Sequence, residues 1–130
     1  MKIIEELEDA IDDEIHDIKK YAKLATEMKE DHPMLAQLLY TISTQEDAHQ
    51  QALHTEVVKI VNSYRESNGE PPAAMMAVYE YVHKKHIDKL AEARRYQDIY
   101  KNMKIIKYLT KFMIAHANAS LLQASTCGAK

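Results

Sequence analysis

The feature that most constrains this chain is its scarcity of residues that interrupt helices. Its 130 residues include only two glycines and three prolines. Two short segments, Asp31-His32-Pro33 and Asn68-Gly69-Glu70-Pro71-Pro72, hold four of these five residues. The long stretches between them are rich in Ala, Leu, Met, Lys, Glu and Gln, which favours long helices over many short strands. The sequence therefore predicts an all-α fold.

The two breaks set the expected helix boundaries. Pro33 and Pro72 suit the first turn of a helix, and Gly69 suits the position that ends one. We therefore expect helices over 2–30 and 33–67, and a third helix starting near residue 72. Because short loops join antiparallel neighbours, these helices should form an antiparallel bundle.

The end of the chain is harder to divide. A turn at Asn102 would leave a fourth helix over 104–124, although a single longer helix through this region stays open. The small and polar residues 125–130 predict a flexible C-terminal tail. We expect residues 1–124 to form one domain.

Apolar residues recur at steps of three and four along the first two expected helices, as on the buried face of a bundle helix. The first helix carries Ile4, Leu7, Ile11, Glu14, Ile18, Tyr21, Ala25 and Met28 in this pattern. The second carries Leu35, Leu39, Ile42, Glu46, His49, Leu53, Val57, Ile60 and Tyr64.

Three polar residues interrupt these apolar faces. Glu14 lies 17 residues before Asp31, whereas Glu46 and His49 lie 15 and 18 residues after it. In an antiparallel pair with its turn near Asp31, all three reach the same level, roughly 25 Å from the turn at about 1.5 Å per residue. An isolated buried carboxylate is costly, so it needs a partner, a proton or a metal. Two carboxylates and an imidazole at one level would make half of a carboxylate-bridged di-metal site.

These residues resemble the ferritin-like superfamily, and in particular its rubrerythrin-like branch. The chain has a first-helix Glu14, then Glu46-Asp47-Ala48-His49 after an interval of 32 residues, with Tyr21 two turns after Glu14. It is also similar to small rubrerythrin-like proteins of phages and prophages, through the run that begins at Gly69-Glu70-Pro71-Pro72 and ends at Tyr79. The resemblance covers roughly residues 1–101. It implies a ferritin-like four-helix bundle in which Glu46 bridges two metal ions, Glu14 and His49 are terminal ligands, and Tyr21 lies beside them.

The second half departs from the pattern that this resemblance implies. The same interval would pair Glu80 with Met113 and His116, and a thioether cannot replace a hard carboxylate at iron. Glu80 and His83 form a second Glu-x-x-His that could supply ligands instead. His86 follows one turn after His83, and the register of these residues stays open.

Charge and composition exclude several other classes of protein. The net charge of −3 comes from mixed acidic and basic residues, without the basic stripe of a nucleic-acid-binding protein. No apolar run reaches the about 20 residues that span a bilayer. The N-terminus does not read as a signal peptide, and the one cysteine, Cys127, suits a reducing cytoplasm. We expect a cytoplasmic homo-oligomer, most simply a dimer.

Three functions remain open from the sequence. The first is a small ferritin-like protein that binds Fe or Mn between the first two helices, with oxidase, peroxidase or iron-handling chemistry. The second is a metal-free, non-catalytic helical protein that acts through oligomerisation or a protein partner. The third is a surface Zn or Ni site formed by His83 and His86. Whether the protein is an enzyme is not decided by these residues.

Overall fold

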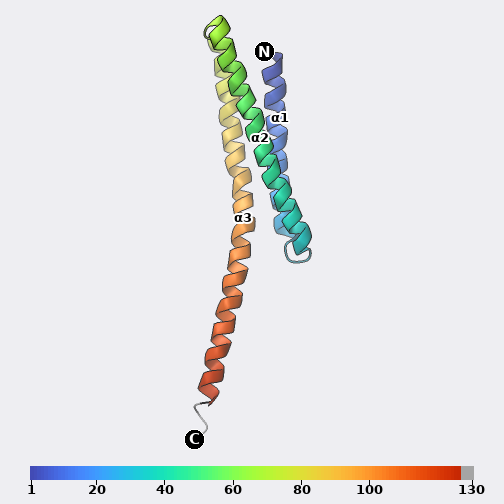
Figure 1. Cartoon of the computed structure of the whole chain (residues 1–130), viewed down its shortest axis with the longest axis vertical. Coiled ribbons are helices and arrows are strands. Elements are labelled where there is room, and N and C mark those ends of the chain that lie inside the picture. Colours follow the sequence, from blue (N-terminus) through green and yellow to red (C-terminus); the bar gives the residue numbers. More distant parts are fainter. Residues whose placement is uncertain (127–130) are drawn as a thin grey trace.

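The computed structural model describes residues 1–126, except for the side chains of 104–106 and 123–126, and shows three helices. They are α1 (Lys2–Met28), α2 (Pro33–Asn68) and α3 (Ala73–Thr126). No described residue lies in a strand, so the all-α prediction is confirmed. Helices α1 and α2 form an antiparallel hairpin, and α3 runs back alongside it (Figure 1).

Local chemistry fixes both connections where the sequence predicts them. Pro33 is the first residue of α2, and the backbone N–H of His32 donates to the carbonyl of Met28 at 2.8 Å. Gly69 ends α2 with φ of 78°, a left-handed conformation that glycine adopts without steric cost. Its N–H donates to the carbonyl of Arg65 at 2.9 Å. The connection to α3 is only four residues long, so α3 must turn back antiparallel to α2.

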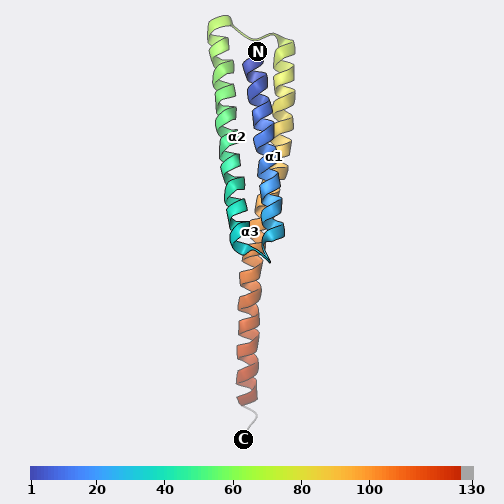
Figure 2. The same cartoon turned by 90° about the vertical axis from the view of Figure 1, so that its right-hand side faces the viewer.

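Helix α1 provides half of the described buried apolar residues and contacts both other helices (Figure 2). Its buried positions follow the three-and-four spacing of a helix packed in a coiled-coil manner. They are Glu8, Ile11, Ile15, Ile18, Ala22 and Ala25. Val57 and Val61 of α2 and Ala93 of α3 pack against the isoleucines in one apolar cluster. A second cluster, nearer the α1–α2 connection, joins Ala25, Ala36 and Tyr100.

One buried polar contact ties the three helices together. The Ser43 hydroxyl of α2 donates to the carbonyl of Ile18 in α1 at 2.7 Å. The side-chain amide of Gln97 in α3 donates to the Ser43 hydroxyl at 3.0 Å and to the Ser43 carbonyl at 3.2 Å. Because buried polar groups are costly without partners, this network fixes the register of α3 on the hairpin.

Ion pairs add to this attachment of α3. Arg94 donates two hydrogen bonds to the Asp47 carboxylate, at 2.7 and 2.9 Å. Lys19 of α1 donates to Glu92 at 2.8 Å, and Lys29 donates to the carbonyl of Tyr100 at 2.9 Å. Helix α3 is therefore held by polar contacts to a greater extent than α1 and α2 are held to each other.

The C-terminal part of α3 corrects the predicted four-helix arrangement. The expected turn at Asn102 and the separate helix over 104–124 are wrong, because α3 continues without a break to Thr126. An asparagine costs a helix less than about 1 kcal/mol, and no glycine or proline is present to stop it. Residues 103–126, which we call the arm, pass the α1–α2 connection, where Lys107 lies 3.7 Å from Glu30, and then extend beyond it (Figures 1 and 2).

The arm exposes a large apolar surface. Residues 107–122 are all exposed, among them Leu109, Phe112, Met113 and Leu121. Neither the arm nor any other described helix holds an apolar stretch that could cross a membrane. The flexible tail at 125–130 stays a prediction, because α3 includes residues up to Thr126 and the rest, with Cys127, lies outside the described residues.

Candidate metal centre

The α1–α2 hairpin brings Glu14, Glu46 and His49 together. Nδ1 of His49 lies 2.9 Å from Oε2 of Glu46 and 3.7 Å from Oε2 of Glu14. Each residue offers one ligand atom, and these atoms lie within 4.8 Å of one another. Their similar distances from the connection place them at one level, and no other three His, Cys, Asp or Glu residues group in this way among the described residues.

The pKa values of the three side chains depend on one another. Burial raises the pKa of Glu14, and the adjacent Glu46 carboxyl raises it further. A hydrogen bond with Glu14 lowers the pKa of Glu46, and His49 adds to this effect. The hydrogen bond to Glu46 raises the pKa of His49. A cation entering this group would therefore take the place of protons, so its binding should weaken in acid.

The group is accessible from solvent. The side chain of His49 is 58% exposed, whereas those of Glu14 and Glu46 are 28% and 19% exposed. Helix α3 lies on another side of the hairpin, where it contacts Ser43 and Asp47. The carboxylates and the imidazole are therefore held by α1 and α2 alone and face away from α3.

The other predicted ligands do not join this group. Glu80 is exposed, and His83 stacks on His54 with ring centroids 4.8 Å apart. His116 lies on the arm, exposed and stacked on Phe112 at 4.7 Å, because α3 does not fold back. These residues remain predictions as metal ligands, but the structure does not place them near Glu14.

Tyr21, predicted beside the centre, is half-buried on α1. Its described ring contact is with Nζ of Lys20, which lies 4.9 Å from the ring centroid. This contact is local to α1, so the structure gives Tyr21 no described link to the three ligand candidates.

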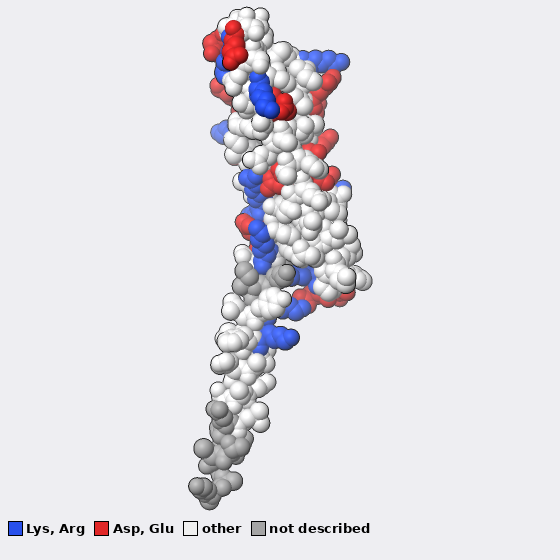
Figure 3. Space-filling view, in the orientation of Figure 1, with Lys and Arg blue, Asp and Glu red and all other residues white. Residues whose placement is uncertain are grey.

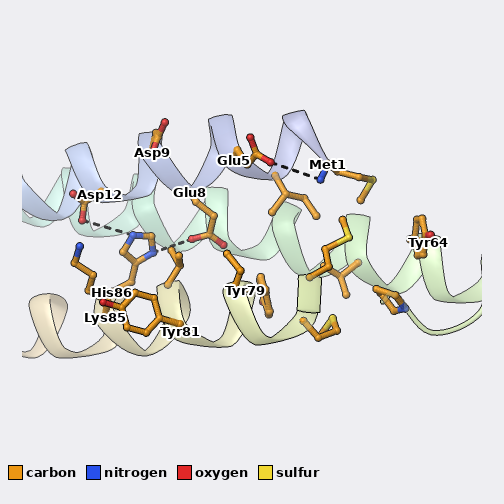
Figure 4. Close-up of a pocket in the computed structure, with 17 residues that line it drawn as sticks. Met1, Glu5, Glu8, Asp9, Asp12, Tyr64, Tyr79, Tyr81, Lys85 and His86 are labelled. Atoms are coloured by element: carbon orange, nitrogen blue, oxygen red, sulfur yellow. Dashed lines mark ion pairs between the residues drawn. The ribbon is translucent and has the colours of Figure 1, made fainter. Parts of the chain in front are cut away.

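A second polar cluster, which the sequence did not reveal, lies between α1 and α3 (Figure 4). Nδ1 of His86 lies 3.0 Å from Oε2 of Glu8, and its Nε2 lies 3.6 Å from Oδ1 of Asp12. Lys89 also donates to Asp12. Glu8, Asp12 and His86 line a cavity of about 440 Å³ whose other walls are mostly apolar. His86 is buried here and His83 stacks on His54, so the two histidines are not both at the surface, and the Zn or Ni site remains a prediction.

Glu8 is the least satisfied group of this cluster. Both of its oxygens are buried, and neither has a hydrogen-bond partner among the described residues, although His86 is close. Burial raises the pKa of Glu8 and lowers the pKa of His86. A clue was available in the sequence, because Glu8 fits the three-and-four spacing of the residues that α1 buries.

A helical hairpin that presents one Glu opposite a Glu-x-x-His defines a class, that of helical bundles with carboxylate–histidine metal centres of the ferritin-like type. The family model described as Rubrerythrin matches residues 5–72, which is more than half of the chain. The chain therefore belongs to the rubrerythrin family. The match includes α1, α2 and all three residues of the candidate centre, and it ends before α3. No curated protein and no solved structure matches the chain.

Proposed function

We propose that this protein binds Fe or Mn through Glu14, Glu46 and His49 and uses it in iron-handling or oxidase- or peroxidase-type chemistry. The observation that carries the proposal is the convergence of two carboxylates and one imidazole within 4.8 Å on the matched hairpin. Membership of the rubrerythrin family makes iron the first metal to test.

The donor set fits these metals. Carboxylate oxygens and imidazole nitrogens suit divalent Fe and Mn, and the group contains no thiolate that would favour softer ions. Glu46 lies next to both His49 and Glu14, and in this proposal its carboxylate would be the bridging ligand. Glu14 and His49 would then act as terminal ligands. Bound Fe(II) would supply the electrons for reducing dioxygen or peroxide.

The chain itself would position the ligands and set their affinity for protons. Glu14 holds a proton more readily than an ordinary carboxyl because of its burial and its neighbour Glu46. A divalent ion at this group would compete with protons for the same carboxylates. We expect proton release on metal binding and an affinity that falls as the pH is lowered.

Metal titration of the purified protein tests this proposal. Fe(II) under anaerobic conditions, or Mn(II) in air, should bind at about one ion per chain and raise the melting temperature. His49→Ala should weaken binding by about 100-fold or more, because a lost ligand costs at least as much as a lost supporting contact. His16→Ala, an exposed histidine on α1, is the matched control and should bind normally. Less than about 0.2 ion per chain without a thermal shift would overturn the proposal.

The arm supports a second candidate function, association through a helical surface. It exposes Leu109, Phe112 and Met113, and it carries Lys107 and Lys111 without any acidic residue. Phe112→Glu with Met113→Glu would abolish association through this surface in light scattering. Unchanged mass and unchanged partners would count against an interaction role for the arm.

A further inference from the structure

The ligand set of one chain is half of what a di-metal bundle requires. Such centres take one Glu from each of two helices and one Glu-x-x-His from each of two others. One hairpin of this protein supplies one Glu14 and one Glu46–His49 pair. The remaining half must come from elsewhere if two ions are to be bound.

Helix α3 does not supply that half. It packs on another side of the hairpin, through contacts with Asp12 and Lys19 on α1 and with Ser43 and Asp47 on α2. Of its histidines next to the hairpin, His86 pairs with Glu8 and His83 stacks on the ring of His54. The face that carries Glu14, Glu46 and His49 is therefore open on the side away from α3.

This open face has the character of an interface. The first half of α2, residues 34–45, contains no charged residue. Leu35 and Leu38 within it are 44% and 56% exposed. Figure 3 shows a broad surface without Lys, Arg, Asp or Glu at the end of the bundle near the α1–α2 connection. Depletion of charge around exposed apolar side chains is typical of the core of a protein interface.

The apolar residues of α2 are spaced symmetrically on either side of the candidate ligands. Ile42 and Leu53 lie four residues outside the Glu46–His49 pair on either side, and Leu35 and Ile60 lie eleven residues outside it. If two α2 helices met antiparallel at this pair, Ile42 would lie level with the partner's Leu53. Leu35 would lie level with the partner's Ile60. Such self-complementarity is what a two-fold interface requires.

Helix α1 has the same symmetry about Glu14. Leu7 and Tyr21 both lie seven residues from Glu14, which is close to the midpoint of the helix. Ile18 of α1 and Ser43 of α2 are in contact, which places Glu14 opposite the Glu46–His49 pair. One two-fold axis therefore passes through the centre of symmetry of both helices.

We propose that the metal centre forms between two copies of this chain, with Glu14, Glu46 and His49 of each copy facing those of the other across a two-fold axis. This inference rests on the proposed function. The pair of hairpins completes a four-helix bundle, and its four carboxylates balance the charge of two divalent ions. Each chain then contributes half of the ligands, and neither chain binds the pair of ions alone.

A mixing experiment tests whether the centre is shared. Wild-type chain is refolded with increasing amounts of the variant Glu14→Ala/Glu46→Ala/His49→Ala, and circular dichroism confirms that the mixtures are helical. Mn(II) binding is followed by EPR, which distinguishes a spin-coupled ion pair from single ions. At equal amounts of the two chains, random pairing lowers the coupled signal per wild-type chain to about half, and a large excess of variant removes it. A signal per wild-type chain that dilution leaves unchanged overturns the shared centre but leaves the proposed function standing. Absence of Mn(II) binding to undiluted wild-type protein overturns both.

A pair of face variants gives an independent readout. Leu35→Glu with Leu38→Glu leaves all three ligands in place and should abolish the coupled-pair signal. The control, Val78→Glu with Ile87→Glu, changes two equally exposed apolar residues on α3 and should retain it. Full coupled signal in the Leu35/Leu38 variant contradicts the shared centre.

Discussion

Helices α2 and α3 each carry a Glu-x-x-His, Glu46–His49 in one and Glu80–His83 in the other. In α2 the two side chains are 2.9 Å apart and face Glu14 of the neighbouring helix. In α3 the glutamate is exposed and the histidine stacks on the ring of His54. The spacing within a helix is the same in both, but only α2 has a third donor at the same level of its neighbour. A ligand motif on one helix therefore becomes a site only through the register of the helix beside it.

The α1–α2 hairpin and α3 also differ in the contacts that hold them in the fold. The hairpin is packed through a row of buried isoleucines and alanines, whereas α3 adds several side-chain hydrogen bonds and ion pairs to its apolar contacts at Ala93 and Tyr100. Beyond residue 103 the arm extends past the hairpin. The free energy of unfolding should therefore depend most on the hairpin core, less on the α3 contacts and least on the arm. Four substitutions test this order.

The largest effect is expected in the hairpin core. Ile18→Ala removes a fully buried side chain and should lower the free energy of unfolding by about 3 kcal/mol. Chemical denaturation followed by circular dichroism measures this loss. Val78→Ala, at a side chain on α3 that is 64% exposed, is the control and should change stability very little. Equal effects of the two substitutions would contradict a core centred on α1.

The next effect concerns the attachment of α3. Asp47→Asn removes the carboxylate that accepts two hydrogen bonds from Arg94 and should cost about 1.5 kcal/mol at pH 7. The hydrogen bond with Arg94 lowers the pKa of Asp47. Its contribution is therefore present above the unfolded value near pH 4 and is lost as the pH falls through the folded value. The wild type and the variant should become equally stable in acid.

A matched control separates this ion pair from general charge effects. Glu30→Gln changes a carboxylate that is 71% exposed and lies 3.7 Å from Lys107. It should have almost no effect at any pH, as is usual for exposed pairs. If Asp47→Asn still lowers the free energy of unfolding below pH 3, packing rather than charge holds α3 at this position.

A smaller effect of opposite sign is expected at the buried cluster. Glu8→Gln should stabilise the protein by about 1 kcal/mol at pH 8, because it removes a buried carboxylate without hydrogen bonds. Burial raises the pKa of Glu8, so the cost of the wild-type residue appears as the pH rises above the unfolded value. The gain should vanish near pH 4, where the carboxyl is protonated in both states. Destabilisation by Glu8→Gln at pH 8 would instead show a stabilising ion pair with His86.

The smallest effect is expected in the arm. Phe112→Ala changes a side chain that is 63% exposed and should alter the unfolding free energy by less than about 0.5 kcal/mol in dilute solution. Urea denaturation at two protein concentrations measures it. A loss above 1 kcal/mol that grows with concentration would show that the arm packs against another chain.

The sequence alone predicts the hairpin well because its signals are local. Pro33 begins a helix and Gly69 ends one through their own backbone geometry, and similar distances from one connection bring Glu14 level with Glu46. The course of the chain after Asn102 depends instead on tertiary contacts, since nothing local forces a turn there. The pairing of His86 with Glu8 likewise depends on the register between α1 and α3, which the buried network of Ser43 and Gln97 sets.

The central claim is that the hairpin holds a transition metal at Glu14, Glu46 and His49. Anomalous diffraction at the Fe edge, on crystals of protein prepared with iron and without chelators, tests it most directly. The account predicts anomalous density among these three side chains. Density at His83 or His116 instead, or none in crystals whose solution metal content is high, would contradict it.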